Sequence, residues 1–137
     1  MEERIVARGH EHVSGTHPST FEVTTDDWLT PAGDCILAIG ADRTPADFDP
    51  AFVRACQDVE ATITATVAVD GHEAVITGRG HPELTFDSHR SGVGRTSDYV
   101  DDRTIMVGAD AAAADLPREL VDALSNGAEL ELVLSVE

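Results

Sequence analysis

Hydrophobic and polar positions alternate most regularly in two stretches of this chain, residues 61–69 (ATITATVAV) and 128–137 (AELELVLSVE). Successive side chains of a β-strand point to opposite faces, so a period of two predicts a half-buried strand in each stretch. Asp70-Gly71 follows the first stretch and is a strong signal for a two-residue hairpin turn. The turn predicts that residues 61–69 pair with a further strand beginning at residue 72.

Two short apolar runs carry no such alternation. CILAIGAD (35–42) and TIMVGAD (104–110) are rich in Ile, Leu, Val and Met, as expected of buried strands. Each is followed by a short helical pattern. In the first, Asp49 is a good N-cap and Pro50 suits the first helical position, with an apolar face at Phe52, Val53 and Cys56.

The second helical pattern begins at about Pro117 and ends at Asn126-Gly127, a typical C-terminal stop. Its apolar positions recur at the three- and four-residue spacing of an amphipathic helix, at Leu116, Leu120, Val121 and Leu124.

The chain also resembles itself. Ala7-Arg8-Gly9-His10 matches Gly78-Arg79-Gly80-His81 at an offset of 71 residues, and GADRTPADFDPAFVRAC (40–56) matches GADAAAADLPRELVDAL (108–124) at an offset of 68. Matching segments in the same order at nearly one offset indicate a tandem duplication. The alternative is coincidence in a chain rich in Ala and Asp.

These patterns predict an α+β fold with one domain over residues 1–137. We expect two ββαβ repeats, at about 1–70 and 71–137, related by a pseudo-twofold axis. Six or more strands and two short helices would form one continuous sheet or a barrel-like closure. The strand at 128–137 would be a free edge able to pair across a homodimer.

The charge balance narrows the setting. The 137 residues carry a formal net charge of −17, and all nine basic residues are arginine. Repulsion between charges of one sign destabilises a compact chain in dilute salt. Molar salt shortens the Debye length to about 3 Å and so screens most of this repulsion. We therefore expect a cytoplasmic protein of an extreme halophile; an acidic mesophilic protein is the alternative.

The same charge argues against nonspecific binding to nucleic acid or to an anionic membrane. The sequence MEERIVARGHEHV lacks the apolar stretch of a signal peptide, and no apolar run approaches the ~20 residues that span a bilayer. Two cysteines are too few for a disulfide framework.

Three segments carry a family resemblance: THPSTFEVTTDDWLTPAGDCILAIGAD, GRGHPELTF and DDRTIMVGADAAAADLPRELVDAL. They resemble an archaeal family of uncharacterised proteins, defined as a domain of unknown function, and this chain resembles a haloarchaeal member. The resemblance spans nearly the whole chain and implies an archaeal cytoplasmic protein. It implies no activity, cofactor or catalytic residue.

The repeated Arg-Gly-His is the main candidate for chemistry. On a strand, Arg8 and His10 share a face, as do Arg79 and His81. If a twofold axis relates the halves, two guanidiniums and two imidazoles approach each other and form a cradle for a phosphate or carboxylate. The alternative is that each arginine pairs with a nearby carboxylate.

His10-x-His12 is also a metal-ligand spacing. His81 would complete a shell, with His17 or His89 and a carboxylate such as Glu11 or Asp87 as further ligands. The alternative is that the spacing arises by chance.

The stretch HRSGVGRTSDY (89–99) offers glycine amides at Gly92 and Gly94 and charges at Arg90 and Arg95 for a phosphate. A plain surface loop is the alternative.

Cys35 is a candidate nucleophile. The alternative is that Cys35 is a small buried residue of the core.

These observations favour a small domain that binds an anionic metabolite, with or without a metal, at the interface of its repeats. No cofactor is identified, and enzymatic activity stays open. The alternative is a non-catalytic protein that acts through a macromolecular partner, an RNA or a protein. The expected ligand-binding residues are Arg8, His10, Arg79 and His81, with His17, His89 and Arg95 at the rim.

Overall fold

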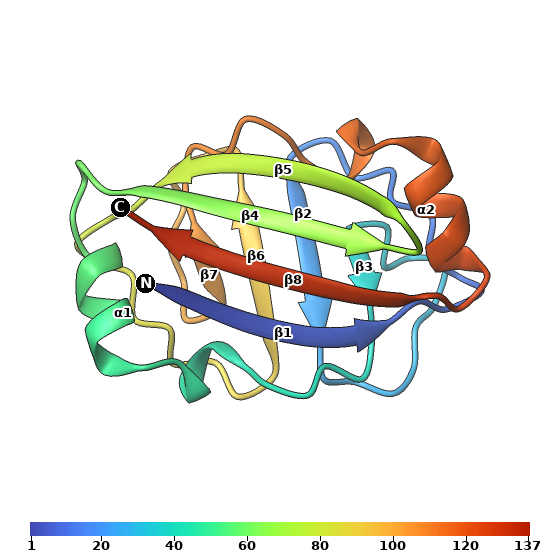
Figure 1. Ribbon diagram of the computed structural model, residues 1–137, viewed down its shortest axis with the longest axis horizontal. Coiled ribbons are helices and arrows are strands. Elements are labelled where there is room, and N and C mark those ends of the chain that lie inside the picture. The colour runs from blue at the N-terminus through green and yellow to red at the C-terminus, as the bar shows by residue number, and fades with distance from the viewer.

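The computed structural model describes all residues 1–137 and has a mixed α+β architecture of two four-stranded sheets with a helix at each end (Figure 1). Strands β1 (Glu2–Arg8), β2 (Thr20–Thr24) and β3 (Ile36–Ala38) precede the 3₁₀ turn η1 (Pro45–Asp47), helix α1 (Pro50–Cys56) and β4 (Thr62–Val69). The order then recurs as β5 (His72–Arg79), β6 (Ser91–Arg95), β7 (Thr104–Met106), η2 (Ala113–Asp115), α2 (Arg118–Ser125) and β8 (Glu129–Val136).

The first sheet has the antiparallel order β1-β8-β4-β5. In β4 and β8 every second side chain is buried, as the alternation in the sequence predicted. Asp70 and Gly71 form the predicted hairpin turn with φ of 49° and 81°. The predicted free edge at residues 128–137 is wrong, because β8 lies between β1 and β4; the edge strands are β1 and β5.

The second sheet has the order β3-β2-β6-β7, with β2 and β6 antiparallel at its centre and a parallel strand at each edge. Its central strands correct two expectations. The predicted ββαβ unit undercounts the strands, since Thr20–Thr24 and Ser91–Arg95 are strands in their own right. The predicted surface loop at 89–99 is therefore half strand, with Ser91, Gly92, Val93 and Gly94 buried.

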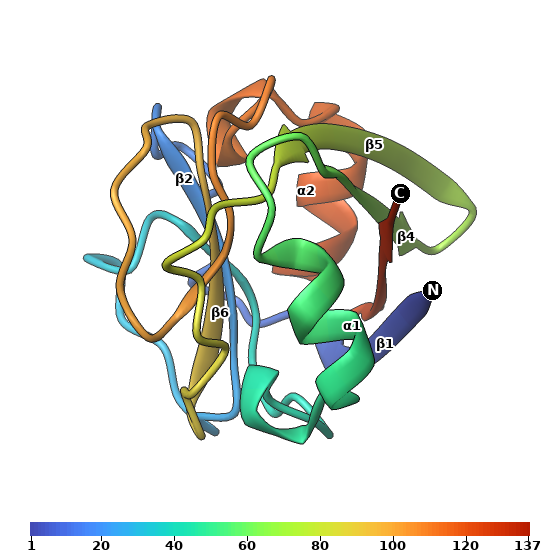
Figure 2. The same cartoon turned by 90° about the vertical axis from the view of Figure 1, so that its left-hand side faces the viewer.

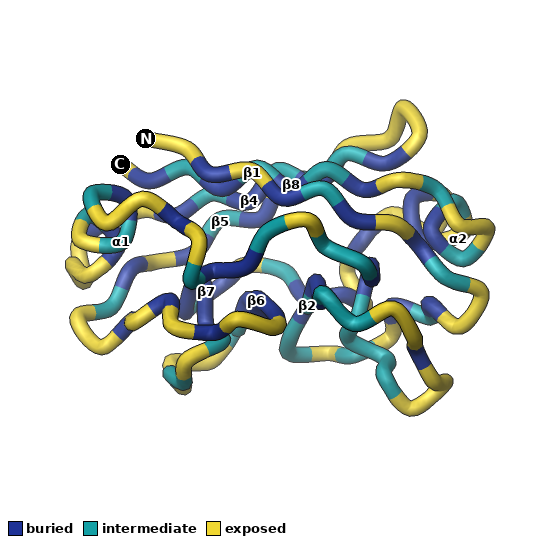
Figure 3. Tube along the Cα trace, turned by 90° about the horizontal axis from the view of Figure 1, so that it is seen from below, coloured by how far each residue is buried: buried dark blue, intermediate teal, exposed yellow.

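The sheets pack face to face around a single cluster of buried apolar side chains. In Figure 3 the trace of the buried residues is coloured dark blue. Two isolated β-bridges connect the sheets by backbone pairing. One joins Arg8 to Ile39 and the other joins Arg79 to Val107. The expected continuous sheet or closed barrel is thus wrong: there are two separate sheets.

The two helices cover the open ends of the layered core (Figure 2). In α1, Asp49 accepts the Ala51 amide at 2.7 Å as the predicted N-cap, with Pro50 at the first turn. In α2, Leu120, Val121 and Leu124 are buried as predicted, and Gly127 ends the helix with a φ of 87°. Neither helix is long or apolar enough to cross a membrane.

The glycines of the repeated Arg-Gly-His bring each edge strand against the helix of the other half. A Cβ on Gly9 would lie 1.9 Å from the Leu124 carbonyl oxygen in α2. A Cβ on Gly80 would lie 2.3 Å from the Cys56 carbonyl oxygen at the end of α1. Only glycine allows this approach of two backbones, so the motif recurs for a packing reason.

Candidate functional site

The structure does not bring the two Arg-Gly-His segments together. Arg8 ends β1 and Arg79 ends β5, and these antiparallel strands form opposite edges of the four-stranded sheet. The arginines therefore lie at diagonally opposite corners of the sheet, near α2 and α1 respectively (Figure 1). The predicted four-residue cradle is not assembled, because strands β8 and β4 lie between the two arginines.

The alternative explanation for Arg8 and Arg79 also fails, since neither arginine is in an ion pair with a carboxylate. Their guanidiniums pack on Gly40 and Gly108, whose φ values are 63° and 57°. A Cβ on Gly40 would meet the Arg8 Nη1 atom at 2.2 Å. Each arginine thus covers the left-handed glycine of a Gly-Ala-Asp segment.

The histidines of the motif stabilise turns. The Nδ1 atom of His10 accepts the His12 amide at 3.0 Å, and that of His81 accepts the Glu83 amide at the same distance. His17 accepts the amides of Ser19 and Thr20 through its Nδ1 atom. These side chains act as local backbone caps.

The structure contains no group of three or more His, Cys, Asp or Glu side chains arranged to hold a metal ion. His10 and His12 are neighbours, with ring centroids 5.2 Å apart, but His81 lies at the end of β5, far across the sheet. The predicted shell of His10, His12 and His81 is therefore not assembled.

The glycine-rich stretch offers no phosphate cup either. Gly92 and Gly94 lie in β6, and a Cβ on Gly94 would sit 2.1 Å from the Phe21 ring. Arg95 donates to Thr104 and Asp101 and stacks on Tyr99. Arg90 pairs with Asp26 at 2.8 Å, and these hydrogen bonds hold the pKa of Asp26 below its ordinary value.

Asp101 anchors the turn before β7. Partial burial alone would raise its pKa, but hydrogen bonds from the Arg103 amide and the Thr104 hydroxyl, and the charge of Arg95, lower the pKa below its ordinary value. Arg95 therefore supports a structural turn.

The thiols are poor nucleophiles. Burial and the neighbouring Glu22 carboxylate raise the pKa of Cys35 to about 11, and burial raises the pKa of Cys56 to about 12. Nucleophilic cysteines need a lowered pKa, so the structural interpretation of Cys35 is favoured.

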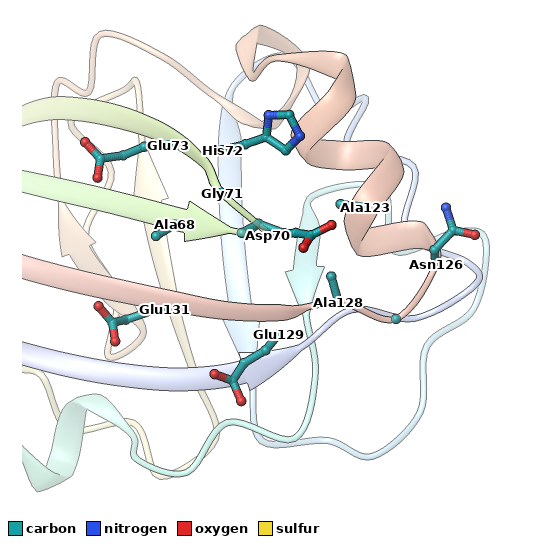
Figure 4. Close-up of a pocket in the computed structure, with 12 residues that line it drawn as sticks. Ala68, Asp70, Gly71, His72, Glu73, Ala123, Asn126, Ala128, Glu129 and Glu131 are labelled. Atoms are coloured by element: carbon teal, nitrogen blue, oxygen red, sulfur yellow. The ribbon is translucent and has the colours of Figure 1, made fainter.

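Two hollows remain on the surface. The larger, about 720 Å³, lies between the β4–β5 turn and the end of α2 (Figure 4). Four carboxylates surround it, those of Asp70, Glu73, Glu129 and Glu131. This acidic hollow repels an anionic ligand.

The second hollow has different chemistry. It measures about 480 Å³ and lies between η1 and α1 on one side and the segment joining β5 to β6 on the other, so both halves of the chain contribute to it. Phe48, Phe86, Pro45 and Val53 supply an apolar lining, and polar groups line the rest: Arg54, Gln57, Thr85, Asp87 and His89. We call this hollow the α1 cleft.

Hydrogen bonds join the two walls of the α1 cleft. The Gln57 amide nitrogen donates to the Leu84 carbonyl at 2.7 Å, and the Ala46 amide donates to the Ser88 carbonyl at 3.1 Å. Asp47 is the last residue of η1. A hydrogen bond from the Thr44 amide lowers the pKa of Asp47, and the charges of Arg43 and His89 act in the same direction. The two walls of the α1 cleft are therefore fixed relative to each other by hydrogen bonds within the protein.

Phe86 is the most unusual residue of the cleft. Its φ of 52° lies in the left-handed region, which bulky residues seldom adopt. Its buried ring packs with those of Phe48 and Phe52, at centroid distances of 5.8 and 6.2 Å. Strained backbone of this kind clusters at functional sites.

The second half has no open hollow at the position that corresponds to the α1 cleft, because the Arg118 side chain occupies it. Arg118 stands where the first half has Pro50, and its guanidinium donates to the carbonyls of Gly15 and Ala113 at 3.1 and 2.9 Å. Gly15 and Ala113 match Phe86 and Pro45 at offsets of 71 and 68. Only the first-half hollow therefore stays open.

Sequence reasoning found two residues of this cleft, His89 and Asp87. It missed Arg54 because that side chain belongs to a helix whose partner segment lies some thirty residues later in the chain. The available signal was the mismatch between the halves, where Pro50 matches Arg118 and Phe86 matches Gly15.

Comparison with known proteins agrees with the resemblance seen in the sequence. A family model described as a domain of unknown function (DUF371) matches residues 5–137. The uncharacterized protein MJ0206 of the archaeon Methanocaldococcus jannaschii is 39% identical over 130 residues, which cover 95% of this chain and 96% of the relative.

Proposed function

Since the chain belongs to the DUF371 family, a domain of unknown function, we propose from its geometry that it binds a small organic acid with an apolar or aromatic group in the α1 cleft. The observation that carries the proposal is Arg54. It is exposed, it lines an apolar cleft, and it is in no ion pair, although the chain holds 26 acidic residues.

A guanidinium beside an aromatic lining suits a planar acid. Arg54 would donate charge-assisted hydrogen bonds to the carboxylate or phosphate, and His89 and Gln57 lie on the same lining. The apolar part of the ligand would contact Phe48 and Phe86. A site of this kind follows the usual pattern of apolar walls with few polar groups.

Replacing Arg54 by Gln is expected to weaken binding of phenyl phosphate at least about 10-fold, as for loss of one charge-assisted hydrogen bond. Binding is measured in molar KCl by calorimetry and by the rise in melting temperature. Inorganic phosphate tests the acid alone, and benzyl alcohol tests the ring alone. Phenyl phosphate should bind more tightly than either.

Arg4→Gln is the matched control, because Arg4 is a surface arginine on strand β1 whose side chain is 63% exposed and pairs with Glu131 at 3.7 Å. This variant should bind as the unchanged protein does. Equal binding by Arg54→Gln, or no stabilisation by any of the three probes, would reject the proposal.

The alternative is a non-catalytic protein that acts through a macromolecular partner, an RNA or a protein. An RNA partner requires a local cluster of free arginines at high salt. Five of the nine arginines are already in ion pairs: Arg4, Arg43, Arg90, Arg95 and Arg103. No observation favours this alternative over the α1 cleft.

We infer that the single domain of residues 1–137 arose by tandem duplication with pseudo-twofold symmetry, each repeat of about 70 residues. Matched contacts support the inference. The Asp42 carboxylate accepts the Val6 amide at 2.9 Å, and the Asp110 carboxylate accepts the Thr77 amide at 3.0 Å. The α1 cleft would then be an interface of the repeats that one copy has left open.

We propose further that the chain works in the salt-rich cytoplasm of a halophilic archaeon, with its lack of lysine, its net charge of −17 and its two free thiols as support. Raising KCl from about a tenth molar to molar is expected to raise the melting temperature by about 8 °C, equivalent to about 2 kcal/mol for a chain of this size.

Three of the four carboxylates of the acidic hollow provide the control for this salt effect. Neutralising Glu73, Glu129 and Glu131 to Gln should shrink the salt dependence, because like charges close together repel most in dilute salt. A melting temperature independent of KCl would contradict the halophilic proposal.

A further inference from the structure

The free edge of β5 differs from the free edge of β1 in one respect. In an antiparallel edge strand, alternate residues direct their backbone N–H and C=O groups away from the sheet. On β5 two of these residues are satisfied: the Arg79 amide donates to the Val107 carbonyl at 2.7 Å, and Thr77 accepts the Asp110 amide at 2.9 Å. The next two outward residues, Val75 and Glu73, make no hydrogen bond beyond the sheet.

The corresponding part of β1 is protected. The Arg4 carbonyl accepts Nη1 of Arg43 at 2.9 Å, and Arg43 is held in place by an ion pair with Glu3 at 2.8 Å. At an offset of 68, Arg43 matches Ala111, which has no group to reach the strand. Arg4 itself matches Val75 at an offset of 71.

This part of the β5 edge is therefore unprotected, and it carries one exposed apolar side chain among polar ones. Val75 is 56% exposed, one of the few large apolar side chains at the surface. In Figure 1 β5 forms the upper rim of its sheet, and in Figure 2 the β4–β5 hairpin stands out from the body of the molecule. Such an edge is a template for another strand.

We propose that a second copy of this chain pairs with β5, antiparallel and about a twofold axis at Ala74. Val75 of each copy would then face Glu73 of the other, and the N–H groups of these two residues on each edge would donate to the C=O groups of the residues opposite them. A second copy fits because one strand supplies matching donors and acceptors in antiparallel register. The two sheets of order β1-β8-β4-β5 would become one continuous sheet.

The charge of the chain makes this pairing depend on salt. Each copy carries −17, and the Glu73 carboxylates lie near the axis. Molar salt, with a Debye length of about 3 Å, removes most of that repulsion. Sedimentation equilibrium in molar KCl should therefore give about twice the chain mass of 14.5 kDa.

Val75→Pro is the decisive variant. Proline removes only an N–H that has no partner in the single chain, and an edge strand accepts proline on its outward side. The variant should stay folded, with a melting temperature within a few degrees of the unchanged protein, and should sediment as a monomer. Glu73→Pro, which removes the other N–H of this edge that has no partner in the single chain, should do the same.

Thr66→Arg is the control, since Thr66 lies opposite Val75 on the neighbouring strand β4 and shares its outer face but not its edge. It should leave the dimer intact. A monomer at all concentrations of the unchanged protein, or a dimer that persists in both Val75→Pro and Glu73→Pro, would overturn the proposal.

Discussion

Replacing Gly80 by alanine is expected to lower the free energy of unfolding by about 3 kcal/mol, the upper end of what overpacking usually costs. The added Cβ would lie 2.3 Å from the Cys56 carbonyl oxygen and 2.4 Å from that of Asp58. Neither oxygen can move alone, since the His81 amide donates to the Cys56 carbonyl at 3.0 Å. The strand and the end of α1 would have to separate.

Gly9→Ala should cost as much, because its Cβ would meet the Leu124 carbonyl oxygen in the same way. Gly127→Ala is the control: Gly127 has a φ of 87° but no atom within 4 Å of an added Cβ, so its loss should cost only about 1 kcal/mol. Denaturant titration in molar KCl measures all three. Equal losses at the three positions would mean that close packing is not the reason for the repeated glycine.

Replacing Phe86 by alanine is expected to cost about 3–5 kcal/mol, the usual range for a buried phenylalanine. Phe86 is 2% exposed and packs with Phe48 and Phe52. Replacing it by glycine should cost about 1 kcal/mol less than alanine, because a φ of 52° strains every residue that carries a Cβ. The matching residue of the first half, Gly15, has a φ of 56°.

Phe48 provides the matched control, since it is also buried but has an ordinary φ of −71°. There the order should reverse, with alanine more stable than glycine. The melting curves of the four variants test this directly. If alanine is the better replacement at both positions, Phe86 is not under backbone strain, and the argument that links strain to the α1 cleft fails.

Local sequence patterns predicted the strands, turns and helix ends that depend on interactions between neighbouring residues. The alternation in 61–69 and 128–137 produced strands with every second side chain buried, and Asp70-Gly71 produced a hairpin. Asp49 caps α1, and Gly127 ends α2. The strand at Ser91–Arg95 was missed, because it is rich in glycine and is buried by contact with Phe21 from the other half.

The site illustrates the same limit. The matched Arg-Gly-His segments were visible in the sequence, but whether they lie close together depended on the order of the strands in the sheet. Strands β1 and β5 became opposite edges of one sheet, so Arg8 and Arg79 are separated by β8 and β4. The residues that do share a cleft, Arg54 and His89, lie on segments with no common pattern.

The sequence by itself determined the type and ends of most elements, the net charge and the family, because these depend on neighbouring residues and on composition. The tertiary structure decided which strands are edges, which arginines are free, and where the halves leave a cleft. Those features depend on backbone pairings between residues far apart in the chain, and no local preference encodes such pairings.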